Sequence, residues 1–288
     1  MKFILTLWAC CLGVLPRLPA QVSVEVVMDQ DQILPGESLV VGVRITNFSG
    51  QKLRFGIDND WVHFTIEGRD GYVVPMTGDV PVQGEFEVES STVATKRVDV
   101  APYFAITKPG HYLVTALIKL KEWDRQLATK QKGFDVIAGT KLWEQDFGVP
   151  VPSGEARVPE VRRYALQQAI HLKQMKLYAR VTDQVESRVF VCFPLGPMVS
   201  FSKPECQIDK SSNLHVLYQT GARSFNYSVL NPDGKLIVRQ THEYSDTRPI
   251  LRSDRDSRII VDGGVRRRSR DDFPPPADTT NEAPTAKP

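Results

Sequence analysis

The stretch PGHYLVTALI, from Pro109 to Ile118, decides the fold because a turn leads directly into an alternating pattern. Proline and glycine favour a turn, and the apolar side chains after them occupy every second position. A β-strand points successive side chains to opposite faces of its sheet, so this spacing predicts a strand with one buried face. The side chains expected to face the core are Tyr112, Val114, Ala116 and Ile118.

The residues around this stretch repeat the same organisation. Between residues 22 and 138, short runs rich in β-branched and aromatic residues alternate with turn signals such as PGE at 35–37 and NFSG at 47–50. No run in this half has helical periodicity. We therefore predict an all-β fold class in which residues 22–138 form an antiparallel sandwich.

A tyrosine near the start of a late strand resembles the tyrosine corner of immunoglobulin-like sandwiches. With Gly110, Tyr112 and the phrase PGESL at 35–39, residues 22–138 resemble the Ig-like, or fibronectin-like, modules of secreted bacterial proteins. The resemblance implies that the Tyr112 hydroxyl bonds back to the preceding corner. Val114 stands where antibody domains carry a cysteine, so no disulfide between the sheets is implied. The alternative is that Tyr112 is one more β-favouring aromatic residue.

The composition changes after Ile137. Prolines and glycines with few apolar neighbours, as in FGVPVPSG at 147–154, predict a linker over residues 139–159 that spaces two domains without fusing them. Residues 160–264 are expected to form a second antiparallel β domain, because apolar runs alternate there with polar turns. The segment 161–175 favours a short helix by its Gln, Ala, Leu and Lys content, yet Tyr164, Leu166 and Gln168 also alternate.

The sequence NPDG at 231–234 predicts a hairpin in the second domain. Pro232 fixes φ for a turn, and Gly234 accepts the left-handed conformation. The neighbouring phrases LHVLYQTG at 214–221 and FNYSVLNPDGKLIVRQ at 225–240 weakly resemble blades of a β-propeller. Because the segment is too short for a closed propeller, an open sandwich and blade-like sheets both remain as interpretations.

The N-terminus predicts export. Lys2 precedes an apolar run, and Leu18-Pro19-Ala20 suits signal peptidase, so residues 1–20 are interpreted as a signal peptide. The run is shorter than the roughly 20 residues that span a bilayer, and we expect no transmembrane segment after cleavage. Cys10 lies in a faint resemblance to a lipobox, which leaves lipidation as an alternative. We expect a periplasmic or extracellular location, and the short signal and cysteine-poor sandwich favour a bacterial host.

Charge limits the partners. Cleavage removes Lys2 and Arg17, which leaves 34 basic and 34 acidic residues. A neutral chain lacks the basic face that displaces counterions from phosphates, so we expect no nucleic-acid partner. Residues 265–288 are rich in proline and polar residues and are expected to form a disordered tail. Four of its residues either contact an anionic surface such as lipid or wall polymer, or form a solvated domain end: Arg266, Arg267, Arg268 and Arg270.

Cys192 and Cys206 are the two cysteines that remain after cleavage. An oxidising compartment allows a disulfide between them, and their spacing suits neighbouring strands around a turn near Gly196. Two buried thiols that pack as small apolar residues are an equally good interpretation. A metal site is not expected, because no CxxC or histidine cluster accompanies the cysteines.

The sequence shows no pattern of catalytic residues. The motifs HExxH, GxSxG and GxxxxGK[ST] are missing, and we expect no catalytic residues and no cofactor. We predict an exported, non-catalytic protein that binds an envelope protein or polysaccharide through strand edges or through loops at one end of the sandwich. The rivals are a hydrolase or its accessory subunit, with loops near His215, His242 and Asp246, and a peptidase inhibitor built on the Ig-like module.

Overall fold

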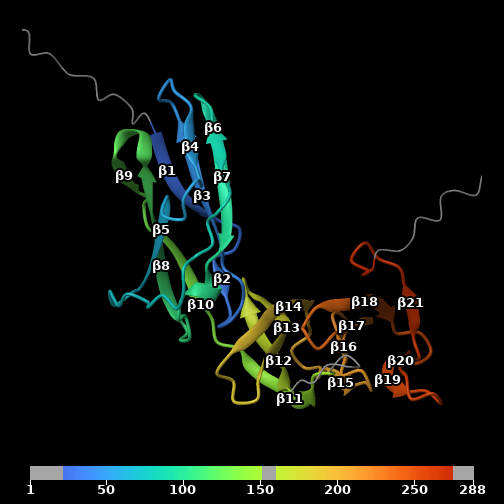
Figure 1. Cartoon of the computed structure of the whole chain (residues 1–288). Helices are drawn as coiled ribbons and strands as arrows, with labels where there is room; N and C mark the ends of the chain where they lie inside the picture. Colours follow the sequence, from blue (N-terminus) through green and yellow to red (C-terminus); the bar gives the residue numbers. More distant parts are fainter. Residues whose placement is uncertain (1–21, 151–159, 275–288) are drawn as a thin grey trace, which may run out of the picture.

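The structure, a computed structural model, describes residues 22–150 and 160–274 (Figure 1). These residues form an all-β protein of several sheets with no closed barrel, which confirms the predicted fold class. Two short 3-10 helices interrupt the strands: η1 (Ala101–Tyr103) and η2 (Lys121–Trp123). In the described part of the chain, no helix has the length and apolarity needed to cross a bilayer. The predicted signal peptide, residues 1–20, lies outside the described residues.

Ten strands form the N-terminal body: β1 (Val22–Met28), β2 (Gln32–Ile33), β3 (Val40–Asn47), β4 (Leu53–Phe55), β5 (Val62–Gly68), β6 (Phe86–Val88), β7 (Thr92–Asp99), β8 (Gly110–Leu120), β9 (Arg125–Ala128) and β10 (Lys132–Val136). One sheet has the order β1-β3-β7, and the other has the order β2-β10-β8-β5 with β9 also paired to β8. Strands β4 and β6 form a separate ribbon. All pairs are antiparallel except β2 with β10, which is parallel.

A single apolar core fills the space between these sheets. The side chains at alternate positions of β3 and β8 are almost completely buried, as Ile45 and Val114 illustrate with no exposed surface. Aromatic rings close one end of the core, where the centroids of Phe55 and Trp61 lie 5.6 Å apart. The strand predicted from PGHYLVTALI is thus confirmed as β8, and the side chains expected to face inward do so.

Tyr112 lies where the chain enters the second sheet after leaving β7. Its hydroxyl donates a hydrogen bond to the carbonyl of Lys108, with an O···O distance of 2.8 Å. Its ring stacks on Phe134 at 5.6 Å between centroids. This is the hydrogen bond expected of a tyrosine corner, and it ties the start of β8 to the preceding loop.

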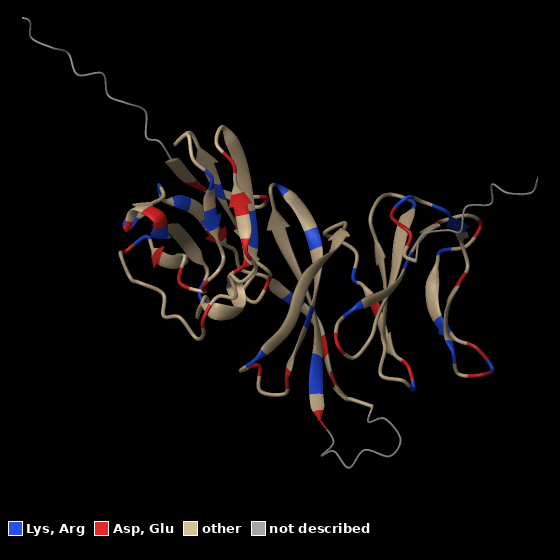
Figure 2. Ribbon diagram, turned by 45° about the horizontal axis from the view of Figure 1, so that its top comes forward, with Lys and Arg blue, Asp and Glu red and all other residues tan. Residues whose placement is uncertain are grey.

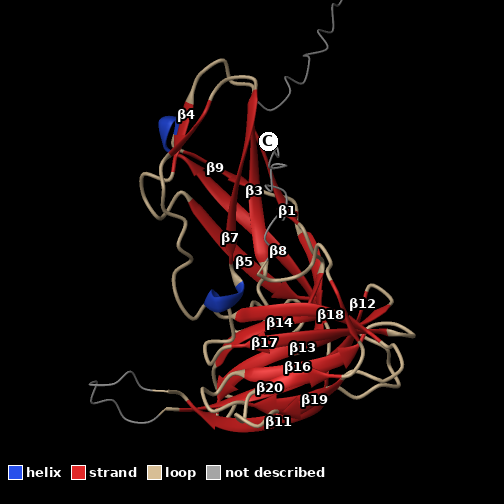
Figure 3. Ribbon diagram, turned by 90° about the vertical axis from the view of Figure 1, so that its right-hand side faces the viewer, coloured by secondary structure: helices blue, strands red, loops and turns tan. Residues whose placement is uncertain are grey.

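The second body contains eleven strands: β11 (Thr140–Gly148), β12 (Val161–His171), β13 (Gln174–Asp183), β14 (Val189–Pro197), β15 (Glu205–Ile208), β16 (Leu214–Gln219), β17 (Ser224–Leu230), β18 (Leu236–Glu243), β19 (Ile250–Ser253), β20 (Ile259–Asp262) and β21 (Val265–Arg267). The orders β11-β12-β13-β14 and β15-β16-β17-β18-β21 define two sheets that share one apolar core. The hairpin β19-β20 covers the outer face of the second sheet. The layers lie side by side in Figure 2, and their strands run across the direction of the N-terminal strands in Figure 3.

The hairpin predicted from NPDG is confirmed. Strands β17 and β18 pair in antiparallel register on either side of it. The Gly234 amide donates to the carbonyl of Asn231, and Gly234 has a φ of +76°, a conformation that favours glycine. The two sheets of this body face each other, which corresponds to the open-sandwich interpretation.

The structure corrects the predicted linker and helix. Residues 140–148 of the expected linker form β11, an edge strand of the second body. Residues 151–159 of the same prediction lie outside the described residues. The segment 161–175 is the hairpin β12-β13, turning at Leu172 and Lys173, which both have positive φ. Pairing with β11 on one side and β13 on the other outweighs the helical propensity of its residues.

The two bodies are packed against each other rather than tethered. Leu34, just after β2, is fully buried against Tyr178 and Cys192 of the second body. We call this contact the joint, formed by Leu34, Ala169, Tyr178 and Cys192 with Ile137 and Val189 at its edge. Gly36 lets the chain approach closely, since a Cβ there would lie 2.6 Å from Val189 Cγ1. The expectation that the domains are spaced without fusing is therefore wrong.

The predicted tail also begins too early. Residues 265–267 form β21, which pairs with β18, and Phe273 forms a bridge with Arg239. Asp272 is buried and contacts Arg266, so residues up to 274 belong to the second body. Residues 275–288 lie outside the described residues.

Candidate functional site

A hollow of about 480 Å³ opens at one end of the N-terminal body. It lies between the turn that ends β5 and the loop that leads into β8, beside the tyrosine corner. Its floor contains buried Val74 and Tyr112, while its rim carries exposed polar and aromatic side chains. We call this the corner hollow, and its rim consists of Arg69, Asp70, Tyr72, Thr107, Lys108 and His111.

Strand pairing holds the two sides of the corner hollow together. Gly68 at the end of β5 lies opposite Tyr112 in β8, so both loops leave neighbouring strands at the same level. The Arg69 amide donates to the His111 carbonyl at 3.1 Å, and the Tyr72 amide donates to Asp70 Oδ1 at 3.2 Å. The loops are therefore fixed to the sandwich by backbone hydrogen bonds.

The side chains of the rim differ in how they are held. His111 Nδ1 lies 2.7 Å from Asp135 Oδ1, which orients the imidazole. Burial, with smaller contributions from Asp70 and Tyr72, raises the pKa of Tyr112, so its hydroxyl stays a donor. Within residues 22–150 and 160–274, neither Arg69 nor Lys108 has a carboxylate partner within 4.0 Å. The hollow thus offers cationic groups that no carboxylate of the described residues occupies.

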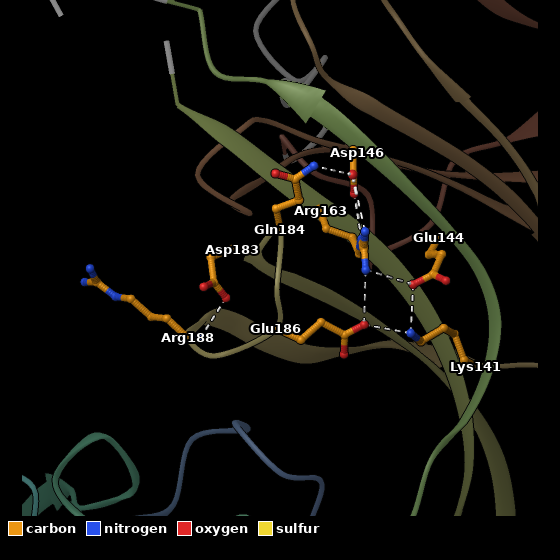
Figure 4. Close-up of polar contacts among 8 residues, drawn as sticks. All are labelled: Lys141, Glu144, Asp146, Arg163, Asp183, Gln184, Glu186 and Arg188. Carbon is orange, nitrogen blue, oxygen red and sulfur yellow. Dashed lines mark hydrogen bonds and ion pairs between the residues drawn. The ribbon is translucent and has the colours of Figure 1, made fainter. Parts of the chain in front are cut away.

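A second cluster of charges covers one face of the sheet at β11 (Figure 4). Arg163 on β12 binds Asp146 on β11, with Nε and Oδ1 2.6 Å apart. Lys141 contacts both Glu144 and Glu186, at 2.7 and 2.8 Å. We call this the β11 network.

Two carboxylates of the β11 network, Asp146 and Glu186, are held in the ionised form by hydrogen bonds. The hydrogen bond from Arg163 lowers the pKa of Asp146, and the hydrogen bond from Lys141 lowers the pKa of Glu186. A general acid for glycoside hydrolysis needs a carboxyl whose pKa is raised. The network therefore suits a structural role. Its charged side chains lie on the edge strand β11 and disfavour pairing of that strand with another chain.

A line of buried polar rings crosses the sheet under the β19-β20 hairpin. His215 Nδ1 lies 2.7 Å from the Tyr227 hydroxyl, and His215 Nε2 lies 3.2 Å from Asp209 Oδ2. The rings of Tyr227 and His242 meet edge to face at 6.3 Å. Burial lowers the pKa of both histidines, so both are neutral at pH 7. We call these residues the histidine row.

The histidine row only partly matches the loops that the hydrolase alternative singled out. His215 and His242 do share one face of the sheet, through Tyr227. Asp246 lies in the exposed turn after β18, and in the described part of the chain no hydrogen bond or ion pair joins it to either histidine. Both rings are at least nine-tenths buried.

The predicted disulfide between Cys192 and Cys206 does not form. Both thiols are free, and burial raises the pKa of each to about 12. Cys192 lies in β14 at the joint, whereas Cys206 lies in β15 of the other sheet. The chain crosses from one sheet to the next between them, so they do not lie on paired strands. Of the two interpretations, that of packed apolar thiols fits Cys192, which is buried, whereas Cys206 is only partly buried.

Two of the four arginines predicted to contact an anionic surface are paired with carboxylates. Arg267 Nε lies 2.8 Å from Glu243 Oε2, and Arg266 contacts buried Asp272 at 3.4 Å. Arg268 and Arg270 are exposed. Contact with an anionic surface stays a prediction that now concerns mainly these two side chains.

Sequence reasoning expected loops at one end of the sandwich and singled out Tyr112, but it missed Arg69, Lys108 and the β11 network. A signal for the network was present, because Trp143, Gln145 and Phe147 alternate with Glu144 and Asp146 as in a strand. The corner hollow had no such signal, since its residues come from two loops distant in the sequence. No known protein family matches the chain, and no significantly similar protein is found among curated proteins.

Proposed function

We propose that this is an exported, non-catalytic protein that binds another component of a bacterial envelope, and that the corner hollow is its contact site. The observation that carries the proposal is the rim itself, where cationic and aromatic side chains stand exposed around a buried apolar floor. Tyr72, one of the rim residues, has 58% of its surface exposed. Exposed aromatic and arginine side chains are the groups that contribute most to binding at protein surfaces.

Loops are a better contact than strand edges in this protein. One edge strand of the second body, β11, carries charged side chains of the β11 network, which disfavour the addition of another strand. The tyrosine corner and two facing sheets support an Ig-like module for the N-terminal body, a fold that displays loops at its ends. The apolar N-terminal run in the sequence supports export.

The first prediction concerns capture of envelope material. The chain without residues 1–20, immobilised and exposed to a solubilised envelope fraction, should retain material that the variant Arg69→Ala/Tyr72→Ala loses by roughly tenfold or more. The matched control is Arg97→Ala/Tyr244→Ala, which removes an arginine paired with Asp29 and an exposed tyrosine far from the hollow. Circular dichroism checks that all variants fold.

The rival functions give different results in the same experiment. If the double variant captures as much as the unmodified chain, the corner hollow is not the contact site. Release of soluble products from the envelope fraction, abolished by His215→Gln, would identify a hydrolase. Inhibition of a panel of peptidases at stoichiometric concentration would identify the inhibitor alternative.

A further inference from the structure

We infer that the corner hollow binds a saccharide unit that carries a carboxylate, an inference that rests on the proposed function. The size of the hollow is the first reason. Pockets for small ligands have volumes of roughly 300 to 1,000 Å³, and the hollow has about 480 Å³. It is therefore large enough for one or two sugar rings.

The polar groups of the rim match a ligand rich in hydroxyls. Arg69 and Lys108 donate hydrogen bonds, Asp70 accepts them, and Thr107 does both. A sugar hydroxyl both donates and accepts hydrogen bonds, so it can bond to the donors and to the acceptors of the rim. An apolar ligand would cover these groups without replacing their bonds to water, which costs binding free energy.

The aromatic groups match the other face of a sugar. Tyr72 presents an exposed ring at the rim, above the buried side chains of Val74 and Tyr112. The face of an aromatic ring is electron-rich and packs well against polarised C–H groups. A ring of this kind beside hydrogen-bonding groups binds both the apolar and the polar surface of a pyranose.

The charges of the rim favour an acidic sugar. Arg69 and Lys108 are cationic, while Asp70 is the one carboxylate among the residues that line the hollow. Several other cations of this body are paired with carboxylates, as Arg44 is with Glu25 and Lys119 with Asp60. A guanidinium binds a carboxylate through two parallel hydrogen bonds between charged groups, which are stronger than those it makes with the neutral hydroxyls of a sugar.

Isothermal titration with three matched trisaccharides tests the inference. The probes are trigalacturonate, its fully methyl-esterified form, and the neutral galactotriose of the same linkage. Trigalacturonate should bind the full exported chain at least about tenfold more tightly than either neutral probe, because a hydrogen bond to a charged group is worth more than one between neutral groups. Equal binding of the acid and its methyl ester would overturn the inference.

Variants locate the binding and separate it from general attraction between charges. Arg69→Ala and Lys108→Ala should each weaken trigalacturonate binding by about fivefold or more and galactotriose binding by clearly less, because a hydrogen bond to a charged group is worth more, whereas Tyr72→Ala should weaken both equally. Arg97→Ala is the matched control and should change neither. Tighter binding of a sulfated trisaccharide than of trigalacturonate would contradict the carboxylate assignment.

Failure of the inference is distinguishable from failure of the proposed function. If the Arg69→Ala/Tyr72→Ala variant loses capture of an envelope protein while trigalacturonate neither binds nor competes, the hollow is a contact site for protein and the saccharide inference is wrong. If capture itself survives the double variant, the proposed function fails first.

Discussion

Replacing Leu34 by alanine should loosen the joint and let the two bodies move apart locally. Leu34 is fully buried between the N-terminal body and the second body. Removing a buried leucine side chain usually costs about 2 to 5 kcal/mol, through lost burial and the cavity that remains. Even the lower value corresponds to roughly thirtyfold easier opening of the joint. Amide hydrogen exchange at residues 172–180 and 32–37 measures this opening, because the Leu172 amide is bonded to Gln32 across the joint.

Two controls accompany this prediction. Leu34→Met keeps the volume of the side chain and should restore most of the protection. Leu53→Ala removes an equally buried leucine from the core of the N-terminal body, away from the joint, and should accelerate exchange around β4 instead. Unchanged exchange at the joint in Leu34→Ala would mean that the two bodies are held by something other than this contact.

Acidification from pH 7 to pH 5 should destabilise the second body. Burial lowers the pKa of His215 and His242 below the value of 6.5 that they have when exposed. The unfolded chain therefore binds protons more readily than the folded one as the pH falls through 6.5, and stability decreases until the pKa of the folded state is reached. Each histidine contributes about 1.4 kcal/mol for every unit by which its pKa is lowered.

The neighbours of the histidines fix the direction of this effect. Asp209 faces His215, and Arg266 and Asp272 face His242, with Tyr227 between the two rings. Arg266 adds to the lowering at His242, whereas both carboxylates oppose it. Asp146 and Glu186 of the β11 network have lowered pKa values and lose stabilisation only at more acidic pH. The histidine row should therefore dominate between pH 7 and 5.

Urea unfolding at pH 7 and pH 5 checks the prediction. The midpoint should fall for the unmodified chain, and the fall should be much smaller for His215→Gln/His242→Gln, which cannot titrate in this range. The readout is the difference between the two pH values, so a general loss of stability in the variant does not obscure it. An equal fall in both proteins would assign the pH dependence to groups other than these two histidines.

Much of the fold could be predicted from local sequence patterns, because turns and the alternation of side chains along a strand depend on residues that are neighbours in the sequence. The strand β8, the corner at Tyr112 and the hairpin at 231–234 all follow from such patterns. The linker prediction failed because Gly139 and Pro150 bracket β11, and the alternation of Trp143, Gln145 and Phe147 between them received too little weight.

Features that depend on contacts between residues distant in the sequence could not be predicted from the sequence. The segment 161–171 has helical composition, and only its pairing with two neighbouring strands makes it a strand. The joint depends on contacts between Leu34 and side chains more than a hundred residues away in the sequence. Likewise, Arg266 and Arg267 lie beside Asp272 and Glu243 only because β21 pairs with β18. The corner hollow likewise arises from two loops that strand pairing brings together.

The most direct test of the account is nuclear magnetic resonance of the isotope-labelled chain during titration with oligosaccharides released from the envelope. The account predicts that amide shifts change at residues 68–74 and 105–112, around the corner hollow, and that Arg69→Ala/Tyr72→Ala removes these changes. Changes confined to the β11 network or to the histidine row, with the corner hollow unaffected, would contradict it.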